Sequence, residues 1–285
     1  MNELNGKGGK VSIIILNYNG KNLLRNCLGS IKNKTLYKNY EIIIVDNNSK
    51  DGSIKMVQKN FPKVEIIKNP KNYGFSKGNN IGMKRALKGG TDYVLILNND
   101  TEATENWLNE MVGIIESNEK IGMVGPRLIL PNGEIQKNCY NFRFGLIIKF
   151  APDKLQEVDY ITAACMLIKK RVIEEVGFFD EEFSPIYYED ADLCLRTKKA
   201  GYKIVYVPGS KVFHHKGITM RKQEWQFRAI NTNRLKFFFK HFSIPWLILR
   251  LLIEPWNILN ALKEGKLKIL FSIYFKFLRF GKYSI

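Results

Sequence analysis

The sequence predicts an α/β fold built on a mostly parallel central sheet. Short runs of Ile, Leu and Val alternate with amphipathic segments of helical length through the first half of the chain. Uninterrupted apolar runs are typical of strands that helices cover on both faces, and helices of this length connect parallel strands. The predicted strands are 11–17, 41–46, 64–69 and 92–100, and the predicted helices are 21–32, 51–60, 76–90 and 104–115.

The pattern changes after residue 126. Asn132-Gly133 lies between apolar residues, which is typical of a β-hairpin turn. No repeat or low-complexity linker interrupts residues 1–220, so the sequence predicts one continuous domain there. Its second half is expected to contain a strand over 160–170, a helix over 190–201 that stops at a glycine, and a strand over 202–208.

The composition is strongly basic. The 285 residues, 33.0 kDa in mass, include 45 Lys and Arg against 27 Asp and Glu, a formal net charge of +18. This excess favours anionic partners such as nucleotides, lipid head groups or nucleic acid. Charge alone does not choose among them, and a lysine-rich composition can also simply cover a solvent-facing surface.

The cysteines and the chain start bear on the compartment. Cys27, Cys139, Cys165 and Cys194 lie far apart and form no C-x-x-C pair. We therefore expect reduced, buried thiols in a cytoplasmic protein. The first ten residues contain no apolar signal-peptide core, and no run reaches the roughly 18 apolar residues of a membrane-spanning helix.

Residues 221–285 are predicted to form a basic amphipathic helical C-terminal extension. They contain thirteen Lys and Arg against three Glu, a formal charge of +10, among many aromatic and leucine residues. Such helices suit the plane of an anionic membrane, which favours a peripheral location on the cytosolic face. The alternatives are packing on the first domain or forming a dimer interface.

Polar side chains stand where the predicted strands end. In an open parallel sheet, the crevice outside the carboxyl ends of the strands is where ligands bind. One Asp at a strand end is usually a helix cap, whereas several polar residues that converge on one edge indicate a site. The residues in question are Asn17, Asn19, Asp46, Asn98, Asn99, Asp100 and His214.

Two of these residues also have a purely structural interpretation. Asp100 could hold a divalent cation against a diphosphate, or it could cap the helix expected to begin near Thr104. A lone histidine such as His214 is more often a packing residue than a ligand. If Asp100 and His214 share one crevice, they could form a metal site that keeps open positions for phosphate oxygens and water.

The stretch "YYEDADLCLR", residues 187–196, places three carboxylates in a largely apolar setting. On a helix, Asp190 and Asp192 point to different sides because they are two residues apart. Carboxylates in a first helical turn also favour the helix dipole, which offers a structural explanation. The hypothesis for function is that crowding and apolar surroundings raise the pKa of one carboxylate into the range of a useful base.

Six segments, taken in order, resemble family 2 glycosyltransferases of the GT-A fold, especially the rhamnosyltransferase-like branch. The resemblance runs from about residue 11 to 235, and six weak motifs at plausible spacing are together specific. The segments are "VSIIILNYNG", "EIIIVDNNSKDGS", "NPKNYGFSKGNNIGMKRA", "YVLILNNDT", "ITAACMLIKKRVIEEVGFFDEEF" and "YYEDADLCLRTKKAGYKIVYVPGSKVFHHKG".

The resemblance implies an inverting transfer of one sugar from a nucleotide diphosphate sugar to a hydroxyl of a saccharide or lipid-linked saccharide. It makes Asp190 the general base. Asp100, at the last position of a D-x-D motif, and His214 would hold Mn²⁺ or Mg²⁺, with His215 as the alternative to His214. The donor-binding residues that it implies are Asn17, Asn19, Asp46, Asn72, Gly74, Gly78, Asn79 and Asn99.

The sequence departs from the family pattern at two places. Asn98 stands where the first Asp of D-x-D is expected, so the metal should bind more weakly. The "TNRL" at 232–235 matches an Arg-Asn-Arg pattern only in part, and Arg234 is given no role.

Other classes of protein are disfavoured. No G-x-G-x-x-G follows the first strand and no G-K-[ST] occurs, which argues against a dehydrogenase or a P-loop protein. No nucleic-acid-binding motif is present, and no nucleic-acid partner is expected. A non-catalytic nucleotide-sugar-binding protein would be expected to lack Asp100 or Asp190, and a processive synthase to carry spanning helices and Q-x-x-R-W.

Overall fold

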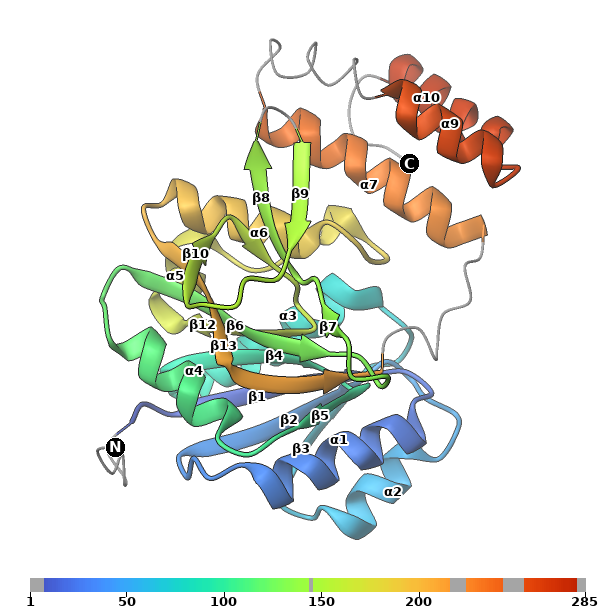
Figure 1. Ribbon diagram of the computed structural model, residues 1–285. Helices are drawn as coiled ribbons and strands as arrows, with labels where there is room; N and C mark the ends of the chain where they lie inside the picture. Colours follow the sequence, from blue (N-terminus) through green and yellow to red (C-terminus); the bar gives the residue numbers. More distant parts are fainter. Residues whose placement is uncertain (1–7, 144–145, 216–223, 243–253, 281–285) are drawn as a thin grey trace.

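The computed structural model describes residues 8–143, 146–215, 224–242 and 254–280 (Figure 1). Four parallel strands form one half of a ten-stranded sheet, in the order β3-β2-β1-β4. They confirm the four predicted strands. The apolar runs of β1, β2 and β4 are largely buried between two layers of helices, whereas β3 at the sheet edge is only partly buried. Their bounds are β1 Val11–Asn17, β2 Tyr40–Asp46, β3 Glu65–Lys68 and β4 Tyr93–Asn98.

The other half of the sheet is mixed. It continues from β4 in the order β12, β6, β13 and β10, and only the pair of β6 with β13 is parallel. Together with the four parallel strands of the first half, the long parallel pair of β6 with β13 makes this an α/β fold with a large, mostly parallel sheet, as predicted. The bounds are β5 Thr101–Ala103, β6 Ile121–Ile129, β7 Ile135–Gln136, β10 Gln156–Val158, β12 Cys165–Lys169 and β13 Lys203–His214, with β5 paired to β13 and β7 to β6.

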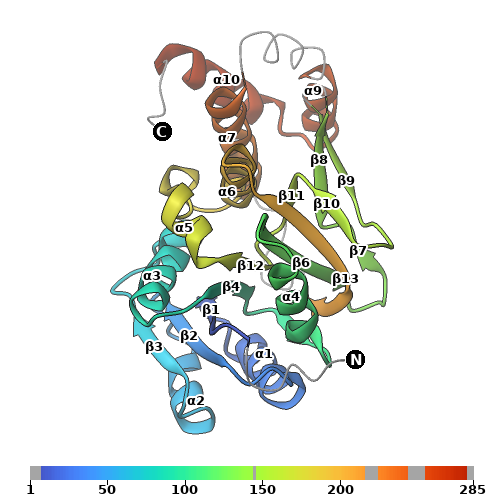
Figure 2. The same cartoon turned by 90° about the vertical axis from the view of Figure 1, so that its left-hand side faces the viewer.

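Helices cover both faces of this sheet, as Figure 2 shows for α3 and α5 on one side and α1 and α4 on the other. Alternate residues of a strand point to opposite faces, so Ile13 and Ile15 pack under α1, α2 and α4, whereas Ile14 packs under α3, α5 and α6. The helices are α1 Lys21–Lys34, α2 Ser53–Asn60, α3 Gly74–Lys88, α4 Trp107–Glu116, α5 Lys170–Val176 and α6 Glu189–Lys199, with a 3₁₀ turn, η1, at Glu181–Phe183.

The segment predicted as one strand over 160–170 is two strands in two sheets, so that prediction is wrong. Residues 162–164 separate them, and the Ala163 N–H donates to the carboxylate of Asp190. A small second sheet has the order β11-β8-β9. Its strands are β8 Cys139–Arg143, β9 Leu146–Phe150 and β11 Tyr160–Ile161.

The hairpin was predicted correctly, whereas the last strand of the sheet is longer than predicted. Gly133 has φ +84° in the turn between β6 and β7, which confirms the hairpin. The strand expected over 202–208 instead runs on to His214. The register against β6 shifts between Val207 and Lys211, and this irregularity accommodates Pro208, which has no N–H to donate.

The C-terminal helices lie beyond the sheet, at the top of Figure 1. Phe237 and Phe238 of α7 pack with Phe183 and Ala191, next to the start of α6. Arg234 donates to the hydroxyl of Tyr274 over 3.1 Å, which links α7 to α10. None of the helices in the described ranges combines the length and the apolar character that crossing a membrane requires. Among the described residues these helices are α7 Glu224–His241, α9 Glu254–Lys263 and α10 Leu267–Phe280.

Candidate active site

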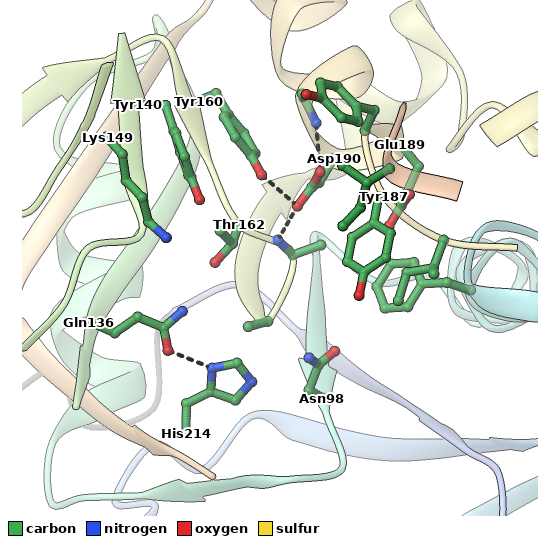
Figure 3. A pocket seen from close by; sticks show the side chains of 17 residues that line it. Asn98, Gln136, Tyr140, Lys149, Tyr160, Thr162, Tyr187, Glu189, Asp190 and His214 are labelled. Carbon is green, nitrogen blue, oxygen red and sulfur yellow. Dashed lines mark hydrogen bonds between the residues drawn. The ribbon is translucent and has the colours of Figure 1, made fainter. Parts of the chain in front are cut away.

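Asp190 stands in the first turn of α6 and faces a cavity of about 400 Å³ (Figure 3). Its Oδ2 accepts hydrogen bonds from the Tyr160 hydroxyl at 3.0 Å and from the Ala163 N–H at 3.1 Å. Its Oδ1 accepts one from the Ala191 N–H at 2.9 Å. Burial raises the pKa of Asp190, while these hydrogen bonds act in the opposite direction.

Glu189 lies beside Asp190 and lines the same cavity. The residue is 3% exposed, and its Oε2 has no hydrogen-bond partner. Burial, and next the charge of Asp190, raise the pKa of Glu189 well above its usual value. Two adjacent carboxyl groups therefore face one cavity, and the Glu189 group favours its neutral form.

Asp192 points away from the cavity, as its two-residue spacing from Asp190 predicts. Its carboxylate is fully buried and lies 2.8 Å from the Arg196 guanidinium and 2.7 Å from both the Lys240 ammonium and the His241 ring. Burial alone would raise the pKa of Asp192, but the His241 hydrogen bond and the Arg196 and Lys240 charges outweigh it and lower that pKa to about 2. This carboxylate therefore joins α6 to α7.

Asp100 and His214 meet at the carboxyl edge of the sheet. Pairing of β5 with β13 sets Thr101 opposite His214, which brings the Asp100 Oδ1 within 3.3 Å of the His214 Nε2. The His214 Nδ1 lies 2.8 Å from the Gln136 Oε1, an arrangement that fixes the ring and leaves Nε2 toward Asp100. His214 and Gln136 both line the cavity.

The donor set of this pair suits a divalent cation. The Asp100 Oδ1 is buried and accepts no hydrogen bond, although it is a strong acceptor. The capping alternative for Asp100 is wrong, because α4 begins at Trp107 and its N-cap is Asn106. Within the described ranges no group of three or more His, Cys, Asp and Glu side chains could hold a metal ion.

His215 is oriented differently from His214. Its side chain pairs with Glu102, at 2.9 Å between Nε2 and Oε1, and its N–H donates to the Asp100 carbonyl at 2.8 Å. Successive strand residues point to opposite faces, and only His214 of the two lines the cavity.

Asn17, Asp46 and Asn99 form one network at the ends of β1, β2 and β4. The Asn17 Nδ2 donates to the Asp46 Oδ1 at 3.1 Å, and the Asn17 Oδ1 accepts from the Asn99 Nδ2 at 3.0 Å. Asn19, with φ +50°, accepts at its Oδ1 from the Lys50 N–H at 2.7 Å. Parallel register places these residues side by side, as the strand-end pattern predicts.

The remaining residues predicted to bind the sugar donor lie just before α3 or within it. The Asn72 Oδ1 accepts from the Asn47 Nδ2 at 3.0 Å and from the Gly74 N–H at 2.9 Å. Gly74 has φ +75°, and a Cβ there would lie 2.9 Å from the Pro185 carbonyl oxygen. The Asn79 Nδ2 donates to the Phe75 carbonyl at 3.0 Å, and Asn79 is buried.

Gly78 allows a close approach, but to the protein itself. A Cβ on Gly78 would lie 2.4 Å from Cδ1 of Leu16 on β1. The close contacts of Gly74 and Gly78 are therefore helix-to-sheet and helix-to-loop contacts, and their contact with a donor stays a prediction.

Sequence reasoning missed Gln136, Tyr140 and Tyr160, which line the cavity. Tyr140 and Tyr160 belong to the second sheet, and their stacked rings lie 4.3 Å apart between centroids. The Tyr160 hydroxyl contacts Asp190. These residues come from short antiparallel strands whose pairing no local pattern specifies. The one available signal is the hairpin at Asn132-Gly133, which returns the chain to the sheet edge just before Gln136.

The sheet, with its polar carboxyl edge and its Asp–His pair beside a cavity, has the GT-A fold. A solved complex described as GalNAc-T7 with UDP, GalNAc and Mn²⁺ superposes with a TM-score of 0.68 at 16% identity, over 82% of this chain and 48% of that one. A solved structure of S. aureus TarS residues 1–349 in complex with UDP superposes with a TM-score of 0.58 at 16% identity, over 79% of this chain and 64% of that one. These likenesses establish the fold.

The chain belongs to glycosyl transferase family 2, whose model matches residues 12–177. A low-salt glycan biosynthesis hexosyltransferase of Haloferax volcanii is 25% identical over 90% of this chain and 86% of its own length. An N-acetylglucosaminyl-diphospho-decaprenol L-rhamnosyltransferase of Mycobacterium tuberculosis is 24% identical over 61% and 66%. These findings confirm the family that the six segments indicated.

An uncharacterized protein of Sinorhizobium fredii is 30% identical over 224 residues, 72% of this chain. The chain spans 24% of the length of that relative.

Proposed function

We propose that this protein transfers a single sugar, with inversion, from a nucleotide diphosphate sugar to a hydroxyl of a saccharide or lipid-linked saccharide. The observation that carries the proposal is that Asp190 and His214 line one cavity, while Asp100 contacts His214. A base and a cation site on two sides of one cavity suit displacement at an anomeric carbon. The named relatives transfer hexosyl or rhamnosyl groups, which supports this reaction class.

Asp190 would act as the general base. Its Oδ2 accepts from both Tyr160 and Ala163, which uses both lone-pair directions, whereas Oδ1 accepts from Ala191 alone among the described contacts. Oδ1 therefore keeps an acceptor position and would take the proton of the acceptor hydroxyl. The oxygen of the acceptor hydroxyl then bonds to the anomeric carbon, while the bond from that carbon to the diphosphate oxygen breaks on the opposite face, which inverts the configuration.

Asp100 and His214 would hold Mn²⁺ or Mg²⁺. A divalent cation, when bound, stabilises the negative charge that develops on the departing diphosphate. The unpartnered Asp100 Oδ1 and the oriented His214 Nε2 are suitable ligand atoms. Because Asn98 replaces the first carboxylate of the motif, we expect the cation to bind tightly only together with the donor.

Asp46 would bind the base or ribose of the nucleotide. It lies 3% exposed at the end of β2, where Asn17 and the Ser49 N–H hold both of its oxygens. Asn17, Asn19 and Asn99 would complete this side of the donor pocket. Direct contacts of Asn72, Gly74, Gly78 and Asn79 with the donor remain part of the proposal.

The acceptor side adjoins the C-terminal helices, and we propose contact with an anionic membrane on its cytosolic face. Leu259 and Leu262 of α9 and Phe271 and Phe275 of α10 are exposed. Exposed lysines, including Lys263 and Lys268, accompany them. This combination suits an acceptor whose lipid anchor stays in the bilayer.

The proposal is tested with a panel of UDP-, dTDP- and GDP-sugars, each with Mn²⁺, Mg²⁺ or a chelator. A ligand at 100 times its Kd adds about 2.7 kcal/mol of stability, so a metal-dependent rise in Tm identifies the donor. Transfer is then measured with that donor for wild type, Asp190→Asn and His214→Ala. Asp190→Asn should abolish transfer and keep the donor-dependent Tm rise, and retained turnover would contradict the base assignment.

The alternative function, a non-catalytic nucleotide-sugar-binding protein, predicts a different result in the same experiment. It predicts the same donor-dependent Tm rise for wild type and Asp190→Asn, with no turnover by either protein.

A further inference from the structure

Helix α7 takes part in the cavity although it lies outside residues 12–177, which the family model matches. Its residue Ile230 lines the cavity beside Tyr187 and Tyr188. One turn further along α7, Asn233 is 1% exposed and points toward the segment that precedes α6, the helix that carries Asp190. The contacts of α7 with this segment therefore bear on the geometry of Asp190.

Asn233 donates hydrogen bonds to three successive parts of that segment. Its Nδ2 lies 2.7 Å from the Phe183 carbonyl oxygen, 3.1 Å from that of Ile186 and 3.0 Å from that of Tyr187. The side-chain amide of Asn233 has two N–H groups, so at least one of them is shared between two of these carbonyl oxygens. One buried side chain therefore contacts the segment at three points. We call residues 183–188 the base loop, because it runs directly into Glu189 and Asp190.

Charged residues of α7 hold the two ends of the base loop. The Lys236 Nζ donates to the Glu182 carbonyl at 2.8 Å, just before the loop. After the loop, Lys240 and His241 both contact the buried Asp192 carboxylate at 2.7 Å. The loop is therefore tied to α7 at its start, at its middle and beyond its end.

The base loop needs such restraint because of its backbone conformation. Tyr187 and Tyr188 have φ +82° and +72°, a left-handed region that non-glycine residues rarely adopt, least of all in succession. Surrounding contacts must maintain a strained conformation of this kind. The Asn233 hydrogen bond to the Tyr187 carbonyl acts at the strained residues themselves.

We propose that Asn233 is a positioning residue: by fixing the base loop it sets the place of Asp190 relative to the sugar donor. It follows that α7 is part of the active site, and that a boundary at residues 220/221 separates residues that work together. The catalytic part of this inference rests on the proposed function. The structural part, that Asn233 holds the loop, does not.

The test compares Asn233→Ala with Asn231→Ala. Both residues are buried asparagines of α7, but the Asn231 Nδ2 donates to Phe227 within its own helix. Amide hydrogen exchange is measured for peptides that cover residues 183–190. Asn233→Ala should raise exchange there at least tenfold, whereas Asn231→Ala should leave it near the wild-type rate.

Transfer kinetics with the donor that the Tm panel identifies supply the second measurement. Asn233→Ala should lower kcat at least tenfold and leave the KM for the donor within twofold, because the nucleotide network lies at β1 and β2. If Asn233→Ala does not fold, Lys236→Met takes its place, because it removes the hydrogen bond to the Glu182 carbonyl but keeps the aliphatic chain. It should show the faster exchange and the lower kcat in weaker form.

The outcomes separate the two proposals. Equal loop exchange and equal kcat in the two alanine variants would overturn the inference while wild-type turnover upholds the proposed function. A wild type without any transfer would overturn the proposed function and the catalytic role together, and loop exchange would still decide whether Asn233 holds the loop.

Discussion

The Tyr160 hydroxyl donates a hydrogen bond of 3.0 Å to the Asp190 Oδ2, so a residue of the second sheet directly contacts the proposed base on α6. Burial, and next the Asp190 charge, raise the pKa of Tyr160 well above its usual value, so its hydroxyl keeps the proton that it donates. The hydrogen bond in turn lowers the pKa of Asp190 against the effect of burial.

Replacing Tyr160 by Phe should therefore shift the acid limb of the pH–rate profile. If Asp190 is the base, it acts as a carboxylate, and activity should fall as pH drops through its pKa. Loss of the hydrogen bond raises that pKa, so the acid limb of kcat/KM should move to higher pH while the upper plateau stays near that of wild type. Tyr37→Phe, which removes a hydroxyl bonded to the Gly9 carbonyl at the opposite sheet edge, is the control. An unmoved acid limb would contradict this role.

Glu189 gives a prediction about stability and pH. Its pKa is raised in the folded state, so the folded protein binds more protons than the unfolded chain above pH 4.5. Stability conferred by the neutral carboxyl group is therefore full below that pH and declines as pH rises. Glu189→Gln stays neutral throughout and should gain stability relative to wild type between pH 4.5 and 7.5, as measured by urea unfolding. A constant difference across this range would show that the group is ionised in the folded protein.

Asp192 predicts the opposite dependence. Its pKa falls from 3.8 to about 2 in the folded protein, which corresponds to roughly 2 kcal/mol of stability. This contribution is present above pH 3.8 and is lost as pH falls toward 2. Asp192→Asn should therefore lose at least that much stability at pH 7, and the difference from wild type should shrink at pH 2.5.

A surface carboxylate provides the control for Asp192. Asp153 pairs with Arg127 at 3.2 Å but has an exposed side chain, so Asp153→Asn should change stability little at either pH. Equal losses of stability in Asp192→Asn and Asp153→Asn would mean that the contacts of Asp192 with α7 stabilise the fold no more than an exposed ion pair does.

Gly78 separates a packing requirement from a donor-binding requirement. An alanine Cβ would lie 2.4 Å from the Leu16 Cδ1, so Gly78→Ala should cost about 1–3 kcal/mol by overpacking. At Gly113 of α4 the same change meets nothing within 4 Å and should gain about 0.5–1 kcal/mol. Urea unfolding measures both effects. A raised donor KM in Gly78→Ala, without loss of stability, would instead indicate that the donor itself needs the glycine.

The parallel strands and their polar ends could be predicted because each depends on local sequence. An apolar run such as 11–17 specifies a buried strand, and parallel pairing then sets Asn17 beside Asp46 without further information. The second sheet could not be predicted in this way. Residues 160–170 read as one strand because most of them are apolar, and the residue at the break, Ala163, donates to the Asp190 carboxylate, which lies further along the chain.

The contacts of the three carboxylates of α6 could likewise be predicted only in part from the sequence. Helical spacing separates Asp190 from Asp192, and this could be read from the sequence. That Asp192 meets His241, and that Asn233 reaches the base loop, depends on how α7 docks on α6. Composition suggested only that residues 221–285 are basic and amphipathic, because an average over a segment does not show which few side chains point inward.

The exposed faces of α9 and α10 predict binding to anionic membranes. Phe271 and Phe275 are four residues apart on one helical face and are 52% and 64% exposed. Burying each ring in a lipid interface contributes on the order of 1.5–3 kcal/mol. The double variant Phe271→Ser/Phe275→Ser should therefore bind phosphatidylglycerol-containing vesicles at least tenfold more weakly in a co-sedimentation assay.

The matched control for this surface lies at the far end of the molecule. Leu36 is 52% exposed just after α1, which Figure 1 shows opposite α9 and α10, so Leu36→Ser should bind vesicles like wild type. Raised salt should weaken binding by wild type, because lysines such as Lys263 and Lys268 act through screened charge. The competing interpretation is a dimer interface: a double variant that becomes monomeric by light scattering, with unchanged vesicle binding, would assign the exposed rings to a second copy of the chain.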